Sequence, residues 1–245
     1  ELRRRQRETL AQRAPRLASR VVWLDTVPAH FDGVVLANEV LDAMPVHLLA
    51  WREAGIFERG VALDANGELS WEERPAQGAL LAAAQALAVA APYQSEINLA
   101  ARAWIRQWGN ILGQGALLLI DYGFPQREYY HPQRNEGTLM CHYRHHAHGD
   151  PFFLPGLNDL TAHVDFSALA RAGEEAGLEG LVYTSQAQFL INCGMMDILA
   201  RHSPADAANY LPLANKVQKL LSPAEMGELF KVLALARGIG SALMG

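Results

Sequence analysis

Three short apolar runs, each followed at once by a polar or acidic residue, constrain the fold of this chain more than any other feature. They are residues 21–24 before Asp25, residues 34–37 before Asn38, and residues 116–120 before Asp121. Runs that are apolar on both faces are typical of strands buried in a parallel sheet. Helical patterns alternate with these runs along the chain. The alternation predicts an α/β domain with a mostly parallel sheet.

Residues 46–76 have a different pattern and predict a small antiparallel insertion. Short strand candidates over residues 47–52, 57–63 and 69–73 are separated by Gly55 and by the turn signal Asn66-Gly67. Two helices are expected to follow, over residues 78–91 and 95–112. Ser95 is the expected N-cap of the second helix.

The C-terminal third predicts one more helix–strand unit and a helical end. Asp165 can cap a helix over residues 166–176 that Gly177 closes, and residues 178–185 and 188–191 are strand candidates. Ser222-Pro223-Ala-Glu225 forms a capping box, which predicts a final helix that ends at Gly238. The expected division is an α/β domain over residues 1–200 and a C-terminal helical segment, residues 201–245, packed on the same domain.

Composition narrows the possible partners and the compartment. The 245 residues carry a net charge of −5, which gives no electrostatic basis for broad nucleic-acid binding. No segment reaches the ~20 continuous apolar residues of a membrane span. Cys141 and Cys193 are far apart in sequence and form no CxxC pattern, so two reduced thiols in a cytoplasmic compartment are expected. No feature predicts an oligomeric state.

The polar residues after residues 34–37 are the strongest candidates for chemistry, because ligands of open α/β sheets bind beyond the carboxyl ends of the strands. If the chain turns helical there, Glu39 and Asp42 lie on one side, three residues apart. A catalytic carboxylate pair is one interpretation. The alternative is that Asn38 and Asp42 only cap the following turn.

The segment Phe31-Asp-Gly-Val-Val-Leu-Ala-Asn-Glu-Val-Leu-Asp-Ala-Met-Pro-Val-His47 resembles the fourth-strand motif of the MidA-like methyltransferases, relatives of the mitochondrial arginine methyltransferase that assists respiratory complex I assembly. Further segments resemble the family's motifs in the family's order: residues 95–98, 120–125, 137–139 and 159–166. The resemblance covers roughly residues 1–200. It implies a class I methyltransferase (Rossmann-like) fold, S-adenosyl-L-methionine (SAM) as methyl donor, and a protein acceptor, with arginine favoured.

The resemblance also implies roles for individual residues. Asp25 is expected to contact the adenine, unless it caps a turn, and Asn38 and Glu39 are expected beside the reactive methyl group. Because an arginine acceptor stays protonated in water, carboxylates would orient it and offset its charge. Glu39, Asp42 and Glu96 are the candidates. For Glu96 the alternative is an acid in the first turn of a helix, stabilised by the helix dipole.

The remaining candidates lie at another strand end and in a long polar stretch. Asp121 and Tyr122 follow a predicted strand and are expected to contact substrate. Residues 125–156 are too long and polar for a plain connection, and we expect Tyr143, Arg144 and His145 to cover the substrate site. His163 is either a general base or a buried, hydrogen-bonded histidine.

The same stretch is dense in histidine, which could suggest zinc. Structural zinc sites show paired ligands in two clusters, whereas the candidate ligands here form one cluster, so no metal is expected. The candidates are His131, Cys141, His142, His145, His146 and His148. A metal-dependent hydrolase that uses them stays an alternative function, as does a methyltransferase-like assembly factor that binds a partner protein without turnover.

One departure from the family pattern concerns the cofactor. Such enzymes hold SAM with a glycine-rich turn after the first strand, where the backbone must approach the ligand closely. Gly113-Gln-Gly115 lies before a strand, which is the wrong order, and Gly238-Ile-Gly240 follows a predicted helix. The first two strands are therefore expected upstream of Glu1. This chain alone is expected to bind SAM weakly and to be inactive.

Overall fold

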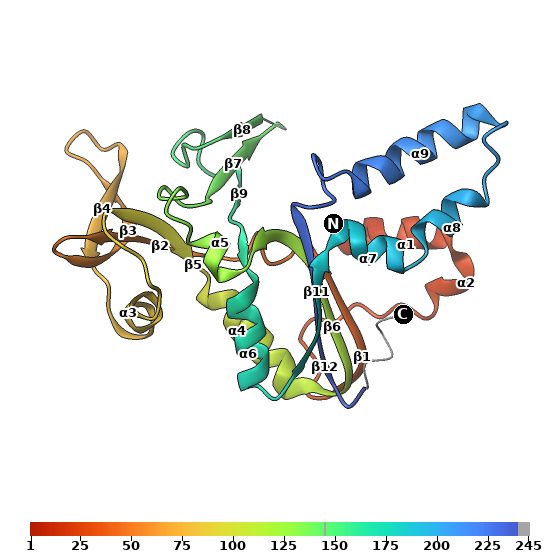
Figure 1. Ribbon diagram of the computed structural model, residues 1–245, viewed down its shortest axis with the longest axis horizontal. Coiled ribbons are helices and arrows are strands. Elements are labelled where there is room, and N and C mark those ends of the chain that lie inside the picture. The colour runs from red at the N-terminus through yellow and green to blue at the C-terminus, as the bar shows by residue number, and fades with distance from the viewer. Residues whose placement is uncertain (145, 240–245) are drawn as a thin grey trace.

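The computed structural model describes residues 1–144 and 146–239, and within them five strands form a central sheet (Figure 1). These strands are β1 (Phe31–Asn38), β6 (Leu112–Phe124), β10 (Val164–Asp165), β11 (Glu179–Ser185) and β12 (Phe230–Arg237). Their order is β1-β6-β12-β11, with β10 paired to the end of β6. β1 and β10 are parallel to β6, whereas β12 is antiparallel to both β6 and β11. The expected α/β fold with a mostly parallel sheet is confirmed.

Two helices, α4 (Leu99–Ile111) and α6 (Phe166–Glu175), cover one face of this sheet. Their buried side chains and those of β1, β6 and β12 form the main core, with Ile105 and Leu169 fully or almost fully buried. Asp165 accepts from the Ala168 amide and so caps α6, as the sequence predicts.

A second, antiparallel sheet lies to one side of the central sheet (Figure 1). Within the described residues it contains β2 (His47–Arg52), β3 (Gly55–Leu63), β4 (Leu69–Pro75) and β5 (Tyr93–Ile97), in the order β4-β3-β2-β5. Helix α3 (Gly78–Gln85) packs on it around a separate core that includes Leu49, Leu80 and Ile97. The predicted antiparallel insertion is confirmed, although its sheet also takes in β5. Ser95 lies in β5, so the prediction that it caps a helix is wrong, and Asn98 caps α4 instead.

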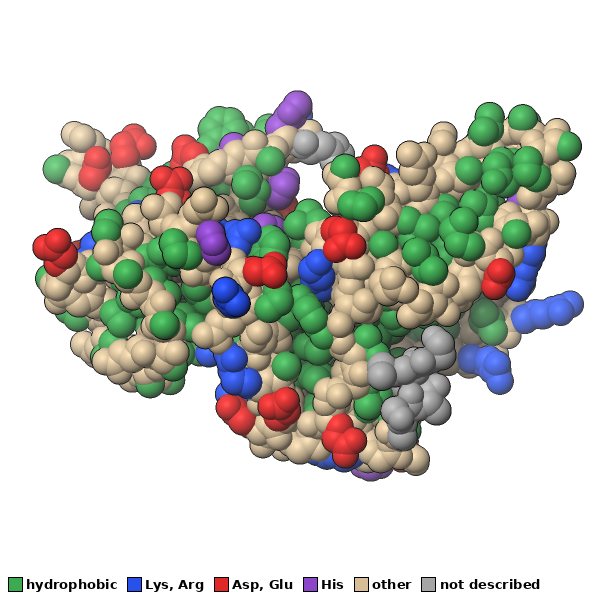
Figure 2. Space-filling model, viewed as in Figure 1, with side chains coloured by type: hydrophobic (Ala, Val, Ile, Leu, Met, Phe, Trp, Pro, Cys, Tyr) green, Lys and Arg blue, Asp and Glu red, His purple; other side chains and the backbone are tan. Residues whose placement is uncertain are grey.

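Among the remaining described elements, three short strands form a third, antiparallel sheet, and the others are helices. These elements are α1 (Leu2–Arg13), α2 (Pro15–Ala18), α5 (Gln126–Tyr129), β7 (Met140–Tyr143), β8 (His146–His148), β9 (Asp159–Thr161), α7 (Gln186–Asn192), α8 (Met195–Ala200) and α9 (Ala207–Leu221). The strand order in the third sheet is β8-β7-β9. Hydrophobic side chains gather on the surface formed by α7, α8 and α9 (Figure 2), and Met196 and Leu211 are exposed there. Among the described residues, no helix combines the length and the apolarity that crossing a membrane would require.

Three expectations about local structure are wrong. Residues 21–24 form no strand, and Val22 is exposed. Residues 188–191 lie in α7. The final helix expected over residues 223–238 is replaced by turns and by β12, whose residues 232–236 are all buried. A strand buried on both faces is a continuous apolar run, and such a run also contains the spacing of an apolar helix face.

β1 is only half buried, which also differs from the expectation. Its inward residues, such as Ala37, face the core, whereas Val34 and Leu36 on the other face are 63% and 65% exposed. β1 approaches β6 very closely at a pair of glycines. A Cβ on Gly115 would lie 1.8 Å from the carbonyl oxygen of Gly33, so no other residue type fits there without displacing the strands.

Candidate active site

The turn that follows β1 projects acidic side chains from the end of the sheet. Glu39 has φ 49°, a left-handed conformation that a non-glycine residue rarely adopts and that is enriched at functional sites. Its amide donates to the carbonyl oxygen of Ile120 at 2.9 Å, which ties the turn to β6. Asn38 donates from Nδ2 to Glu39 Oε1 at 3.3 Å. Both side chains are exposed, and the Glu39 carboxylate faces a cavity beyond the strand ends.

Asp121, near the end of β6, holds this turn in place through hydrogen bonds to its backbone. Its carboxylate accepts from the amides of Leu41 at 3.0 Å, Asp42 at 3.3 Å and Tyr122 at 2.9 Å. The side chain is fully buried. Burial, and next the nearby Asp42 carboxylate, raises the pKa of Asp121 to about 7. Asp121 was expected to contact substrate, and the structure places it beneath the cavity as the support of the acidic turn.

Asp42 and Tyr122 form a hydrogen-bonded pair on the cavity wall. The Tyr122 hydroxyl donates to Asp42 Oδ2, and burial together with this bond raises the pKa of Tyr122 well above its ordinary value. The other carboxylate oxygen, Asp42 Oδ1, is buried and has no hydrogen-bond partner among the described residues. A buried acceptor without a donor is costly, so this oxygen is suited to receive an N–H from a ligand.

His163 lies beside this pair. Its ring is edge-on to Tyr122 and to Phe124, with ring centroids 5.2 Å away in both cases. Burial, and next the charge of Arg134, lowers the pKa of His163 to about 4, so the imidazole is neutral at pH 7. Its Nδ1 is buried without a partner among the described residues. A neutral ring with a free nitrogen can accept a proton or a hydrogen bond.

Glu96 lies behind the cavity and fixes the loop over residues 137–139. Its carboxylate accepts from the Thr138 amide at 2.9 Å, from the Thr138 hydroxyl at 2.9 Å and from the Leu139 amide at 3.1 Å. A Cβ on Gly137 would lie 2.2 Å from Glu96 Oε1, so the loop passes directly over the carboxylate. Thr138 Oγ1 in turn accepts from the His163 amide at 3.0 Å. Glu96 was expected to grip the acceptor, and its oxygens are instead occupied by this loop.

These side chains surround a cavity of about 700 Å³ at the ends of β1 and β6. Figure 2 shows the surface hollowed between the β7–β8 hairpin and the helical region of α7–α9. The described lining residues are Glu39, Asp42, Tyr122, Thr138, Met140, His142, Arg144, Ala147, Asp159, Thr161, His163, Leu229 and Phe230. The described lining contains three carboxylate side chains and one arginine, so the cavity is acidic.

The structure brings five of the predicted site residues together on this cavity: Glu39, Asp42, Tyr122, Arg144 and His163. Asn38, Asp121 and Glu96 contact residues that line the cavity but do not line it themselves. Asp25 is on the surface and pairs with Arg3 at 2.7 Å. Tyr143 packs edge-on against Phe153, with 6.1 Å between ring centroids. His145 lies outside the described residues. Nowhere in residues 1–144 and 146–239 do three His, Cys, Asp or Glu side chains converge as metal ligands would.

Several lining residues were not predicted. Thr138, Asp159 and Thr161 lie within segments that resemble family motifs, so the motifs contained a signal for them. Phe230 had no such signal, because the apolar spacing around it indicated a helix. Only the position of β12 beside β6 brings it to the cavity.

Comparisons with known proteins agree with this geometry. A crystal structure of an uncharacterized protein from Burkholderia thailandensis is 56% identical, with a TM-score of 0.95, over 99% of this chain and 65% of that one. A second structure from the same organism, with S-adenosyl-homocysteine bound, is also 56% identical, with a TM-score of 0.93, over 98% of this chain and 62% of that one.

Curated relatives match more distantly. The mitochondrial protein arginine methyltransferase NDUFAF7 of Danio rerio is 29% identical over 225 residues, which are 86% of this chain and 49% of that protein. The chain thus spans about half the length of the curated relatives it matches. Residues 1–184 match a family described as putative S-adenosyl-L-methionine-dependent methyltransferases. The chain therefore belongs to this MidA-like methyltransferase family, as its motifs predict.

Proposed function

We propose that this chain carries the acceptor side of a SAM-dependent methyltransferase that modifies an arginine side chain of a protein. The observation that carries the proposal is the acidic cavity at the strand ends, with the carboxylates of Glu39, Asp42 and Asp159 on its wall. A guanidinium keeps its charge in water, and carboxylates bind it through short, charge-assisted hydrogen bonds. The arginine methyltransferases among the mitochondrial relatives support this choice of acceptor.

The residues at the end of β1 fit the cofactor. SAM carries its methyl group on a cationic sulfonium and supplies that group to a nucleophile when it is bound. Asn38 and Glu39 offer an amide and a carboxylate at an open strand end, which is where ligands of such sheets bind. The acidic wall suits a cationic ligand, so Asn38 and Glu39 would hold the cofactor beside the acceptor. Asp25 remains a proposed adenine contact.

The chain's own groups can align the acceptor and receive its proton. Tyr122 fixes the Asp42 carboxylate through Oδ2, which leaves Oδ1 free to accept one guanidinium N–H. Glu39 faces the same cavity from the end of β1 and can orient a second N–H. Methylation of a guanidinium nitrogen releases one proton. The neutral His163 can accept it at Nδ1 and, because its pKa is lowered to about 4, then passes it to solvent. Alignment by fixed groups is the main contribution that such a reaction requires.

Apolar residues line the other side of the cavity. Leu229 and Phe230 line it from the segment that enters β12, and Met140 lines it from β7. Arg144, in the long polar stretch, has φ 48° and lies on the rim. We propose that Arg144 and Tyr143 cover the bound substrate. His145, for which the sequence predicts the same role, lies outside the described residues.

Two further proposals concern the domain organisation of this chain and its cellular compartment. We propose that residues 1–200 form the methyltransferase domain and that residues 201–245 belong to it. The position of β12 between β6 and β11 supports that division. The cytoplasmic location expected from two unpaired thiols remains a prediction, and the names of the curated relatives place those proteins in mitochondria.

The experiment is SAM binding by calorimetry on this chain and on a protein of the relatives' length, followed by transfer of radiolabelled methyl groups to proteins of a cell extract. Amino-acid analysis of the labelled proteins should identify methylarginine, and Glu39→Gln should lower the transfer. Asp197→Asn, an exposed site in α8, is the control. SAM binding without transfer would favour an assembly factor, and label on another residue type would refute arginine as the acceptor.

A further inference from the structure

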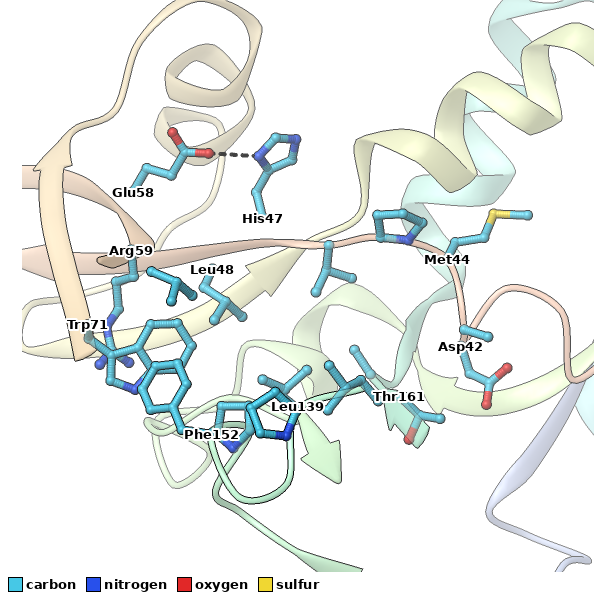
Figure 3. Close-up of a pocket in the computed structure, with 18 of the residues that line it drawn as sticks. Asp42, Met44, His47, Leu48, Glu58, Arg59, Trp71, Leu139, Phe152 and Thr161 are labelled. Atoms are coloured by element: carbon cyan, nitrogen blue, oxygen red, sulfur yellow. Dashed lines mark hydrogen bonds and ion pairs between the residues drawn. The ribbon is translucent and has the colours of Figure 1, made fainter. Parts of the chain in front are cut away.

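A second cavity, a groove of about 570 Å³, runs between the antiparallel sheet of β2–β5 and residues 139–162. Its walls are mostly apolar, with Leu48, Val61 and Trp71 on the sheet side and Leu139 and Phe152 opposite them. Figure 3 shows Trp71 and Phe152 together at one end of the groove and Asp42 at the other end. A cavity of this size and character is typical of ligand-binding sites in proteins.

The groove lies next to the acidic cavity described above. Asp42 and Thr161 line both spaces, and each of these side chains is 6% exposed. These two buried side chains therefore lie between the groove and the acidic cavity. A protein segment that places its arginine among the carboxylates would have its neighbouring residues beside the apolar walls of the groove.

The apolar end of the groove is held rigidly. The Arg59 guanidinium stacks on the Trp71 ring, 4.7 Å from its centroid, and Trp71 and Phe152 are 4.8 Å apart with tilted planes. Arg59 also pairs with Glu73, at 3.4 Å, and donates to Gln94, so its charge is offset within the sheet. Stacked aromatic walls of this kind favour an aromatic or large aliphatic side chain as ligand.

We propose that the groove binds the acceptor protein's own segment next to the methylated residue, with a large apolar side chain of that segment packed against the contacting rings of Trp71 and Phe152. The proposal rests on the function proposed above. It adds a specificity that the acidic cavity alone cannot provide, because carboxylates orient any guanidinium equally well. The position of the groove next to the proposed acceptor site, across Asp42 and Thr161, favours this occupant over a second copy of the chain or a small molecule.

Two positions on β3 provide a matched pair of variants. Val61 lines the groove and pairs across the sheet with Trp71, whereas Leu63 lies two residues further on the same strand and outside the groove. Their side chains are 56% and 67% exposed, so an aspartate is tolerated by the fold at either site. Val61→Asp places a charge on the apolar wall, and Leu63→Asp places the same charge beside it.

The probe is a pool of ten-residue peptides with a fixed central arginine and randomised flanks, bound to immobilised protein of the relatives' length and then sequenced. We expect Phe, Trp or Leu to be enriched about tenfold at one position near the arginine. Val61→Asp should abolish this enrichment and Leu63→Asp should preserve it. With a selected peptide as methyl acceptor, Val61→Asp should raise KM and leave kcat unchanged.

The outcomes separate this inference from the proposed function, because peptide binding is measured without turnover. Enrichment that depends on Val61 but is not accompanied by methyl transfer supports the groove and counts against arginine methylation. Methyl transfer with no apolar enrichment, or with equal enrichment in both variants, overturns the groove proposal alone. A change in sedimentation coefficient caused only by Val61→Asp would identify a second copy as the occupant and would also overturn it.

Discussion

The pH dependence of stability tests how the buried groups at the strand ends ionise. Burial and the Asp42 carboxylate raise the pKa of Asp121 to about 7, against about 3.9 in an unfolded chain. Between these pH values the folded protein holds a proton that the unfolded chain has released, so stability falls as pH rises. The fall is about 1.4 kcal/mol per pH unit and about 4 kcal/mol in all.

His163 contributes a slope of the opposite sign. Its folded pKa of about 4, lowered by burial and by Arg134, is below the value of about 6.5 in an unfolded chain. Between these pH values the unfolded chain holds the extra proton, so stability rises with pH by about 1.4 kcal/mol per pH unit. The contributions of Asp121 and His163 should therefore cancel from about pH 4 to about pH 6.5.

Single substitutions separate the two slopes. Asp121→Asn disturbs the hydrogen bonds of this side chain, which lowers its free energy of unfolding by an amount that does not depend on pH. Beyond that loss, its free energy of unfolding should rise relative to the wild type by about 1.4 kcal/mol per pH unit up to about pH 7. The free energy of unfolding of His163→Asn should fall relative to the wild type by a similar amount per pH unit up to about pH 6.5. Urea unfolding followed by tryptophan fluorescence from pH 4.5 to 7.5 measures both differences.

The control is Asp64→Asn in an exposed turn. Backbone hydrogen bonds, chiefly from the Glu68 amide, lower the pKa of Asp64, so its difference from the wild type should be flat above pH 4.5. A flat difference for Asp121→Asn as well would refute the reasoning. It would mean that the three amides bonded to Asp121 keep its carboxylate charged in spite of burial.

Two further predictions concern the supports of the cavity. In Gly137→Ala the new Cβ would meet Glu96, whereas Gly67 has the same φ of 81° and open space around it. Gly137→Ala should therefore lower the free energy of unfolding by at least about 2 kcal/mol more than Gly67→Ala does. Equal losses in thermal unfolding would contradict the close contact. Tyr122→Phe should cost about 1–3 kcal/mol because it leaves the buried Asp42 carboxylate without its donor, and unchanged urea unfolding would contradict that role.

The elements that sequence predicted correctly have signals that do not depend on the rest of the fold. The Asn66-Gly67 turn has a residue type suited to φ of 81°, and Asp165 caps α6 through its own side chain. For segments that are completely buried, the sequence pattern did not distinguish a strand from a helix. Residues 232–236 are buried on every side in β12, so their pattern has no period that separates a strand from a helix.

The sequence by itself determined the kind of site. Polar residues directly after apolar strands predicted a site with several carboxylates, and Glu39, Asp42 and Tyr122 line a cavity there; that this cavity binds a ligand stays a prediction. Tertiary structure decided what each residue does there. Asp121 and Tyr122 are neighbours in sequence, but successive side chains of a strand point to opposite faces, so one supports the turn and the other faces the cavity.

Glu96 shows the same limit over a longer distance. Its carboxylate is bonded to Thr138, 42 residues further along the chain, and so supports the cavity from behind. The direction and the partners of such a side chain follow from strand pairing and loop position, and no local pattern encodes these. The residue types therefore fixed the chemistry available at the strand ends, and the packing of the sheets decided which groups line the cavity.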